Sequence, residues 1–255
     1  MPVDAGTIES FYAARRAGDF FPAAYANKLS LDDAYAILLG VARLRSERDG
    51  ERRVGWKVGL TAAAIQQQFG FHEPVFACLF GAGRIASGHR FRHSELIAPG
   101  FENELCFVLG EDVPAGASIE RIAQAVARVH PAFELIETRG DFVADPALAM
   151  ADNGQQKAFV IGTGVPLVGL PDLSGVLARV RINDAEVASG LGSAVLGHPL
   201  QSIRWLARKL ASFGERVRAG DYVMAGSFTR QFPIAAGDRI ETVFEGVGAV
   251  RAVFE

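Results

Sequence analysis

FENELCFVL, residues 101–109, predicts a β-strand with acidic side chains on one face and apolar side chains on the other. Successive side chains of a strand point to opposite faces, so Glu102 and Glu104 share a face and lie about 7 Å apart along the strand. Two carboxylates this close repel each other, and something must compensate their charge. A hard divalent cation such as Mg²⁺ or Mn²⁺ would do so, because its preferred ligands are oxygen atoms. The alternative is a solvated acidic face that binds nothing.

A third acidic residue lies in PAFELIETR, residues 131–139, which also reads as an apolar strand. Glu134 faces away from the apolar side chains beside it. An acidic side chain in such an apolar run either forms an ion pair or binds a metal ion, and the alternative is that the segment is not a strand. Arg139 is the simplest ion-pair partner for it. Glu137 lies on the opposite face and is expected to form a structural ion pair.

Lys57 is the candidate for acid–base chemistry. It stands between Trp56 and Val58, with Gly55 and Gly59 on either side. Glycines in a strand allow another backbone or a ligand to approach closely. A lysine in an apolar setting loses its proton more easily and can serve as an acid or base. The alternative is a lysine whose stem lies along the strand and whose amine reaches solvent.

The rest of the chain alternates helical and strand patterns, with no internal repeat. Ser30 and Asp33 predict a capped helix start, and the Asp49-Gly50 pair its end. Helices are expected over 4–17, 30–49, 61–68, 118–130 and 199–213, and strands over 54–60, 101–109, 133–138, 158–161, 179–182, 221–226, 239–245 and 248–254. We therefore expect a mixed α+β protein, with a helical N-terminal cap over 1–50 and a metal-binding catalytic domain over 51–255.

Composition and charge exclude several classes of protein. The 26 basic and 29 acidic residues give a net charge of −3 with no long basic run, so nucleic-acid binding is not expected. No apolar stretch reaches roughly 18 residues and the N-terminus has no signal-peptide pattern, so we expect no membrane span and no export. The cysteines, Cys78 and Cys106, lack metal-ligand spacing, which favours a reducing cytoplasm. The histidines suggest no zinc site, and serine-hydrolase and nucleotide-binding motifs are missing.

Six motifs, taken together and in this order, resemble those of the 2-keto-4-pentenoate hydratase / 4-oxalocrotonate decarboxylase family of the fumarylacetoacetate hydrolase superfamily. They are GWKVGLTAAAIQQQFG (55–70), FENELCFVLG (101–110), PAFELIETR (131–139), ADN (151–153), SGLGSAVLGHPLQSIRWLARKLASFG (189–214) and AGSFTR (225–230). They are spread over nearly the whole chain beyond residue 50, from residue 55 to residue 230. No single motif would suffice, but the set is specific.

The resemblance implies a fold, a metal site and a catalytic residue. The fold is the mixed β-rich roll of the fumarylacetoacetate hydrolase C-terminal type, usually assembled into homo-oligomers. Family members bind Mg²⁺ or Mn²⁺ through three carboxylates, which match Glu102, Glu104 and Glu134. The metal chelates the 2-oxo or 2-hydroxy oxygen and the carboxylate of a short dienoate. The matching lysine, Lys57, lies over the substrate and moves protons.

A substrate-binding set follows from the same resemblance. Ser227 and Arg230 lie in a segment similar to that of hydratases acting on a dicarboxylate. Arg230 would hold the distal carboxylate in a bidentate pair, the alternative being an exposed arginine near a loop. Leu79 is assigned to the same set.

Two departures from the family pattern bear on the substrate. Val75 follows Glu73-Pro74 at a position where the family usually carries an acidic residue, which would serve in substrate binding or water activation. Gln155 and Lys157 follow the ADN motif, where the family tends to have a small hydroxyl residue. Both are assigned to substrate binding, and Lys157 would add a positive charge there. The departures indicate a divergent member with an altered substrate.

The preferred function is hydration of a 2-hydroxy-2,4-dienoate to a 4-hydroxy-2-oxo acid in the meta-cleavage catabolism of aromatic compounds. Decarboxylation of a 2-oxo-3-enedioate is the alternative, because one metal-bound electron sink supports both reactions. A non-catalytic subunit paired with a related hydratase or decarboxylase is a further possibility. Cleavage of a C–C bond in an acylpyruvate agrees less well with the motifs.

Overall fold

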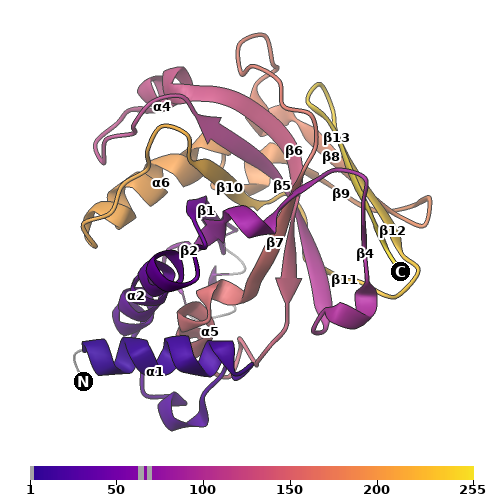
Figure 1. The fold of residues 1–255 in the computed structure, drawn as a ribbon. Coiled ribbons are helices and arrows are strands. Elements are labelled where there is room, and N and C mark those ends of the chain that lie inside the picture. The colour runs from indigo at the N-terminus through magenta and orange to yellow at the C-terminus, as the bar shows by residue number, and fades with distance from the viewer. Residues whose placement is uncertain (1–2, 63–65, 68–70) are drawn as a thin grey trace.

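Strands β5 (Pro99–Leu109) and β6 (Val126–Glu137) pair antiparallel along nearly their whole lengths and form the centre of the larger of two sheets (Figure 1). The computed structural model describes residues 3–62, 66–67 and 71–255. The other strands of this sheet are β1 (Arg53–Gly59), β2 (Val75–Phe80), β3 (Arg84–Ala86), β7 (Gln156–Ile161), β10 (Tyr222–Ser227) and β11 (Phe232–Pro233). Within the described residues their order is β2-β1-β10-β5-β6-β7-β3, with β11 beside β5.

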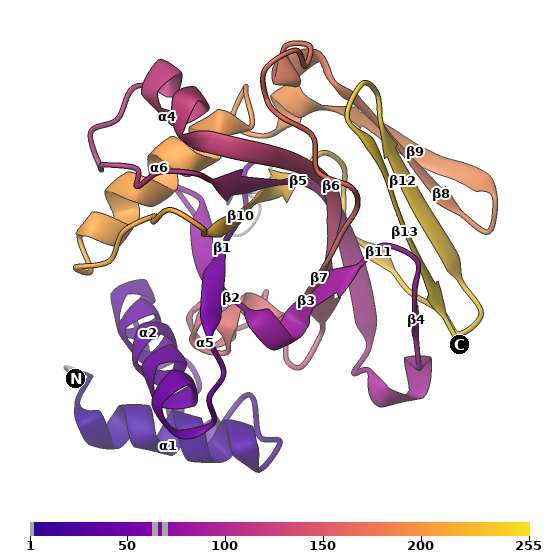
Figure 2. The ribbon, with the colours of Figure 1, turned by 45° about the horizontal axis from the view of Figure 1, so that its top comes forward.

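The larger sheet is curved into a roll. β2 lies at one end of the strand order, yet it contacts β7 near the other end, and Figure 2 shows the strands curving round to bring them together. Gly55 allows part of this arrangement, because a Cβ there would lie 1.9 Å from the carbonyl oxygen of Tyr222 on β10. Side chains on the concave face therefore meet across the roll even when their strands are not neighbours.

A second sheet packs against the roll. It consists of β4 (His89–Phe91), β8 (Leu177–Ile182), β9 (Ala185–Leu191), β12 (Arg239–Phe244) and β13 (Gly248–Phe254), in the order β4-β13-β12-β8-β9. β12 and β13 contact β6, and β13 also contacts β7 (Figure 2). This packing buries the apolar side chains of β5 and β6 that point away from the glutamates.

Helices cover the remaining sides of the roll. They are α1 (Ala5–Arg16), α2 (Leu31–Arg48), α4 (Ile119–Ala125), α5 (Pro146–Ala151) and α6 (Leu200–Ala211). The predicted capping box is confirmed, with Ser30 and Asp33 bonding reciprocally at the start of α2. α2 packs against α1, α5 and β2, and the ring of Tyr35 stacks on Phe76 at 4.2 Å between centroids. The predicted α+β fold with N-terminal helices is confirmed.

One predicted helix is partly wrong, and another falls partly outside the described residues. The helix expected over 118–130 is wrong beyond residue 125, where the chain continues as β6. Pairing with β5 supplies backbone hydrogen bonds to this segment, and such long-range pairing outweighs a local helical pattern. Pro131 also disfavours a helical backbone at His130, the residue before it. The helix expected over 61–68 falls partly on 63–65 and 68, which lie outside the described residues.

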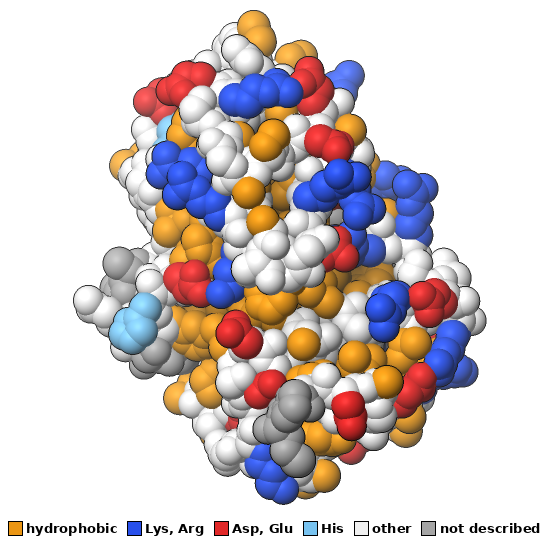
Figure 3. All heavy atoms as spheres, turned by 90° about the vertical axis from the view of Figure 1, so that its left-hand side faces the viewer, with side chains coloured by type: hydrophobic (Ala, Val, Ile, Leu, Met, Phe, Trp, Pro, Cys, Tyr) orange, Lys and Arg blue, Asp and Glu red, His pale blue; other side chains and the backbone are white. Residues whose placement is uncertain are grey.

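The surface carries both signs of charge. On the face seen in Figure 3, basic and acidic side chains are interspersed with apolar ones, in keeping with the small net charge. None of the helices within the described ranges has the length and apolar character required to cross a membrane.

Candidate functional site

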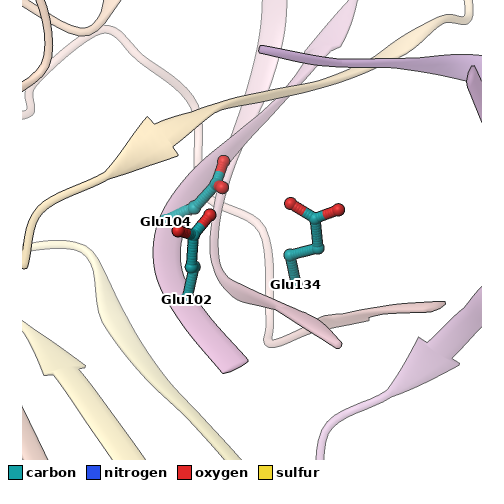
Figure 4. A group of neighbouring side chains, drawn as sticks. All are labelled: Glu102, Glu104 and Glu134. Atoms are coloured by element: carbon teal, nitrogen blue, oxygen red, sulfur yellow. The ribbon is translucent and has the colours of Figure 1, made fainter. Parts of the chain in front are cut away.

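Three carboxylates converge on the concave face of the roll. Glu102 and Glu104 project from β5 and Glu134 from β6, and Figure 4 shows the three carboxylate groups projecting into the same space. Each offers an oxygen atom, and the three atoms lie within 4.8 Å of one another. The strand register explains the meeting, because Glu102 is the direct cross-strand partner of Glu134 and Glu104 is two residues further along β5.

The carboxylates are poorly satisfied by the protein itself. Glu104 and Glu134 have no exposed surface. Glu104 Oε2 accepts a hydrogen bond from the Gly226 backbone N–H at 2.7 Å. Glu104 Oε1 and Glu134 Oε2 are buried and have no hydrogen-bond partner among the described residues. Buried acceptors of this kind are costly unless a cation binds them, so this donor set fits a hard divalent cation.

The electrostatics of the cluster depend on burial. Burial, together with the smaller effect of the Glu102 charge, raises the pKa of Glu134 to about 7 against the opposing effect of Lys57. Burial together with the charges of Glu134 and Glu102 holds the pKa of Glu104 well above its usual range. Without a cation, the cluster therefore retains protons at a pH where isolated glutamates have lost theirs. Because a metal binds the ionised form, its binding must displace these protons.

Lys57 reaches the cluster from β1 across the concavity. Its Nζ lies 3.2 Å from Glu134 Oε1 and donates to the Gly154 carbonyl oxygen at 3.3 Å. The side chain is nearly fully buried. Burial lowers the pKa of Lys57, but Glu134, Glu102 and Glu104 raise it, and the net direction is upward. The expectation of a lysine in an apolar setting is therefore wrong, because the other strands surround its amine with acidic groups.

A cavity of about 400 Å³ opens beside the carboxylates and Lys57. Three of the predicted substrate-binding residues line it: Gln155, Ser227 and Arg230. Its remaining lining is largely apolar, with some polar side chains, and includes Leu60, Thr61, Val75, Ile136, Phe142, Met150, Thr229 and Gln231. Of these residues, the sequence analysis considered only Val75 as part of the site, because the others are brought together only by the fold.

Two predicted substrate-binding residues lie elsewhere. Leu79 is on the same sheet face as Lys57 but deeper in the roll, where it packs in a fully buried apolar cluster, and it does not line the cavity. Lys157 Nζ lies 3.1 Å from Glu137 Oε1, outside the cavity. Glu137 also pairs with Arg139 at 3.1 Å, so its predicted structural ion pair is present. The simpler interpretation expected Arg139 to pair with Glu134, and it is wrong, because the ion pairs of Arg139 are with Glu137 and Asp152.

Glu73 connects the segment before β2 to α6, which carries the WLARK residues of the fifth motif. Glu73 accepts a hydrogen bond from Trp205 Nε1 at 3.3 Å and pairs with Lys209 Nζ at 2.7 Å, both on α6. These contacts anchor the segment that leads into Val75 at the cavity wall. The residue pattern WLARK (205–209) contributes both partners, which lie four residues apart on one helix face.

The chain is similar to known proteins in sequence and in structure. Residues 72–255 match the family described as fumarylacetoacetate (FAA) hydrolase C-terminal. The chain is 35% identical over 231 residues to 2-hydroxyhexa-2,4-dienoate hydratase of Comamonas testosteroni, covering 89% of this chain and 87% of that protein. It is 34% identical over 229 residues to 4-oxalocrotonate decarboxylase of Pseudomonas putida, covering 89% and 86% respectively.

A solved structure shares the fold over almost the full length. It is the 4-oxalocrotonate decarboxylase from Pseudomonas putida G7, complexed with magnesium and adipate. The TM-score is 0.86 at 30% sequence identity, and the similarity covers 98% of this chain and 95% of that one.

Proposed function

Because the chain belongs to the fumarylacetoacetate hydrolase C-terminal family, we propose that it is a metal-dependent lyase that hydrates a 2-hydroxy-2,4-dienoate to a 4-hydroxy-2-oxo acid in aromatic-compound catabolism. One observation carries the proposal. Three carboxylates converge beside a buried lysine at a cavity large enough for a short acid, and two of them, Glu104 and Glu134, have buried oxygens without a hydrogen-bond partner among the described residues. The similarity to a dienoate hydratase supports the reaction type.

The cofactor in this proposal is Mg²⁺ or Mn²⁺, held by Glu102, Glu104 and Glu134. The all-oxygen donor set and the magnesium in the related decarboxylase structure support it. When bound, the cation supplies positive charge opposite the vicinal oxygens of a 2-oxo acid. Gly226 N–H orients Glu104, since it occupies one of its oxygens and leaves the other directed at the cluster.

Lys57 is the proposed acid–base group. Ketonisation of the dienoate moves the 2-hydroxyl proton to C5, and water then adds at C4 while C3 gains a proton. Glu134 and the Gly154 carbonyl oxygen hold the Lys57 amine at the cavity wall, where it can donate and accept these protons. A proton-transfer group must lie within reach of the reacting atom, directly or through one water, and a lysine at the cavity wall meets this requirement.

Gln155, Ser227 and Arg230 are the proposed substrate-binding residues. Arg230 is exposed at the edge of the cavity, and its guanidinium lies over the ring of Phe232 at 4.2 Å. A guanidinium lining the same cavity as Glu102 suits a substrate with a second carboxylate at its far end. The apolar wall between the two ends matches an unsaturated carbon chain.

Decarboxylation of a 2-oxo-3-enedioate is the second candidate, and Val75 favours it. The valine occupies the cavity wall where an acidic side chain would activate water, and loss of CO₂ needs no such group. The similarity to two 4-oxalocrotonate decarboxylases supports the same alternative.

The deciding experiment is an activity assay of the purified protein. The substrates are 2-hydroxy-2,4-dienoates and a 2-hydroxymuconate-type dicarboxylate, each tested with Mg²⁺ or Mn²⁺. Loss of dienoate absorbance with a 4-hydroxy-2-oxo product supports hydration, and captured CO₂ supports decarboxylation. A protein that binds the metal but turns over neither class would instead be the non-catalytic subunit of an enzyme pair.

Assembly and location are separate proposals. We propose a homo-oligomer, because edge strand β9 exposes Val187 and Leu191 and pairs on one side only within the part of the chain that the structure describes. Association with a related hydratase or decarboxylase would use similar surfaces. A cytoplasmic location is supported by Cys78 and Cys106, which are buried free thiols. Light scattering at several protein concentrations tests the assembly.

The division of the chain is also a proposal. Residues 1–50 would form a helical cap fixed on the catalytic domain, 51–255. Contacts that support a fixed cap are the ion pair between Arg15 and Asp152 and the packing of α2 on β2 and α5. Limited proteolysis tests it, because a fixed cap resists cleavage near residue 50.

A further inference from the structure

The turn that contacts Lys57 has an unusual backbone. Asn153, Gly154 and Gln155 are three consecutive residues in the left-handed region, with φ of 56°, 57° and 59°. Side chains with a Cβ rarely adopt this conformation, and a run of such residues persists only where surrounding contacts enforce it. The turn leads from α5 into β7.

The strained turn fixes Lys57 from one side. The Gly154 carbonyl oxygen accepts a hydrogen bond from Lys57 Nζ at 3.3 Å. A Cβ at Gly154 would lie 3.1 Å from Lys57 Cε and 3.4 Å from Nζ, so the turn packs against the end of the lysine with little room for a side chain between them. Any movement of the turn would therefore move the amine relative to Glu134.

Hydrogen bonds hold the turn at its middle and end. The Asn153 side chain accepts from the Cys78 backbone N–H at 2.8 Å and donates to the Cys78 carbonyl oxygen at 2.9 Å. Gln155 Nε2 donates to the Gly140 carbonyl oxygen at 2.7 Å. These bonds attach the turn to β2 and to the segment after β6.

Ion pairs hold the turn at its start. Asp152 Oδ2 accepts from Arg139 Nε at 2.6 Å, and Asp152 Oδ1 accepts from Arg15 Nη1 at 2.9 Å. Arg139 Nη2 also donates to the Asp152 carbonyl oxygen at 3.2 Å. The side chains of Asp152 and Arg139 are fully buried, whereas Arg15 is one-quarter exposed. Arg15 belongs to α1, so the N-terminal helices form part of this clamp.

We propose that Asp152 is a positioning residue for Lys57, and that Arg15 of α1 completes the clamp that holds the left-handed turn against the lysine. The inference rests on the proposed role of Lys57 in proton transfer. It assigns a function to the N-terminal helices: they contribute to the placement of the reacting amine without contacting the cavity carboxylates.

The test compares Arg15→Ala and Arg15→Lys with a matched control, Arg16→Ala. Arg16 is the next residue of the same helix and pairs with Asp49, away from the turn. Arg15 is chosen because it is partly exposed, and Asp152→Asn is the second, more severe variant. The measurements are kcat and KM on the substrate turned over by the wild type, Mg²⁺ affinity by calorimetry, and the unfolding midpoint.

We expect Arg15→Ala to lower kcat by about tenfold, in line with the effect of misplacing a reacting group. KM and Mg²⁺ affinity should stay within about twofold, Arg15→Lys should recover most of kcat, and Arg16→Ala should match wild type. A kcat equal to wild type in Arg15→Ala and Asp152→Asn would overturn the proposal, even if both unfold at lower temperature. A merely structural clamp would have that signature.

The Lys57→Ala variant separates this failure from failure of the proposed function. If Lys57→Ala retains turnover, the proton-transfer role is wrong and the clamp has nothing to position. If Lys57→Ala is inactive while Arg15→Ala and Asp152→Asn are fully active, the reaction stands and the positioning role is wrong. A crystal structure of Arg15→Ala supplies a readout without activity: we expect the contact between Lys57 Nζ and the Gly154 carbonyl oxygen to be lost, and its retention would contradict the clamp.

Discussion

Glu102 and Glu134 occupy directly opposed positions on the antiparallel strands β5 and β6, with their side chains on the same face. Like charges in such a cross-strand pair destabilise a sheet. The protein buries one of the two completely and leaves its Oε2 without a hydrogen-bond partner among the described residues. A cation between the two carboxylates would compensate this repulsion, so we expect the pair to bind a metal ion.

Replacing Glu102 by Gln should weaken Mg²⁺ binding by at least about tenfold, the lower end of the cost of losing a group that merely supports a metal ligand. The amide keeps the shape of the side chain and removes its charge. Titration calorimetry measures the affinity. Glu241→Gln is the control, since Glu241 pairs with Arg251 on the second sheet. Equal affinities for wild type and Glu102→Gln would exclude Glu102 as a ligand.

Replacing Lys57 by Ala should lower kcat by roughly 10²- to 10⁴-fold, the usual contribution of general acid–base catalysis. Mg²⁺ affinity should rise or stay level, because a positive charge 3.2 Å from Glu134 Oε1 is removed. The two effects separate Lys57 from the carboxylates, whose replacement weakens metal binding. Steady-state kinetics at saturating Mg²⁺ provide the measurement, with Lys28→Ala as an exposed-lysine control. Turnover at the wild-type rate in Lys57→Ala would remove the lysine from the mechanism.

Strand alternation was sufficient to place Glu102 and Glu104 on one face, because the period of a strand is a local property. The meeting with Glu134 depends on the register between β5 and β6, and no local pattern encodes a register. The same limit applies to Lys57. Its neighbours in sequence, Trp56 and Val58, are apolar, but the groups around its amine come from other strands.

Leu79 and Lys157, which were predicted to bind substrate, lie outside the cavity for a common physical reason. Leu79 shares a face with Lys57, but the curvature of the roll places it in the apolar cluster rather than in the cavity wall. Lys157 follows the turn that touches Lys57, yet β7 directs its side chain to Glu137. Both outcomes follow from how the sheet curves and pairs, which depends on contacts distant in sequence.

The metal-free protein should lose stability as pH rises from about 4.5 to 7. Burial raises the pKa of Glu134 to about 7, so the folded state binds a proton that the unfolded state has already released in this range. The stabilisation is complete below the unfolded pKa near 4.5 and is lost as pH rises through the folded pKa. For this group the loss amounts to about 3 kcal/mol at most, since each pKa unit corresponds to about 1.4 kcal/mol.

Urea unfolding between pH 4.5 and 8, with chelator or with excess Mg²⁺, measures this effect. Bound Mg²⁺ should reverse the trend, because it stabilises the ionised cluster and its effect grows as protons leave. Glu134→Gln is the matched control and should flatten the pH dependence without metal. A metal-free protein whose stability rises steadily from pH 4.5 to 7 would contradict the predicted protonation of the cluster.

Replacing Arg230 by Ala should raise KM for a dicarboxylate substrate by roughly 10- to 100-fold, because a hydrogen bond to a charged group contributes about 1.5–3 kcal/mol. The value of kcat should change little, since the guanidinium lies at the exposed edge of the cavity and the reacting carbons would lie near Lys57 in the proposed mechanism. A monocarboxylate of similar length should be turned over as well by the variant as by wild type. Arg239→Ala, which removes an exposed arginine paired with Asp184 on the second sheet, is the control. If Arg230→Ala affects both substrates equally, Arg230 does not bind the distal carboxylate.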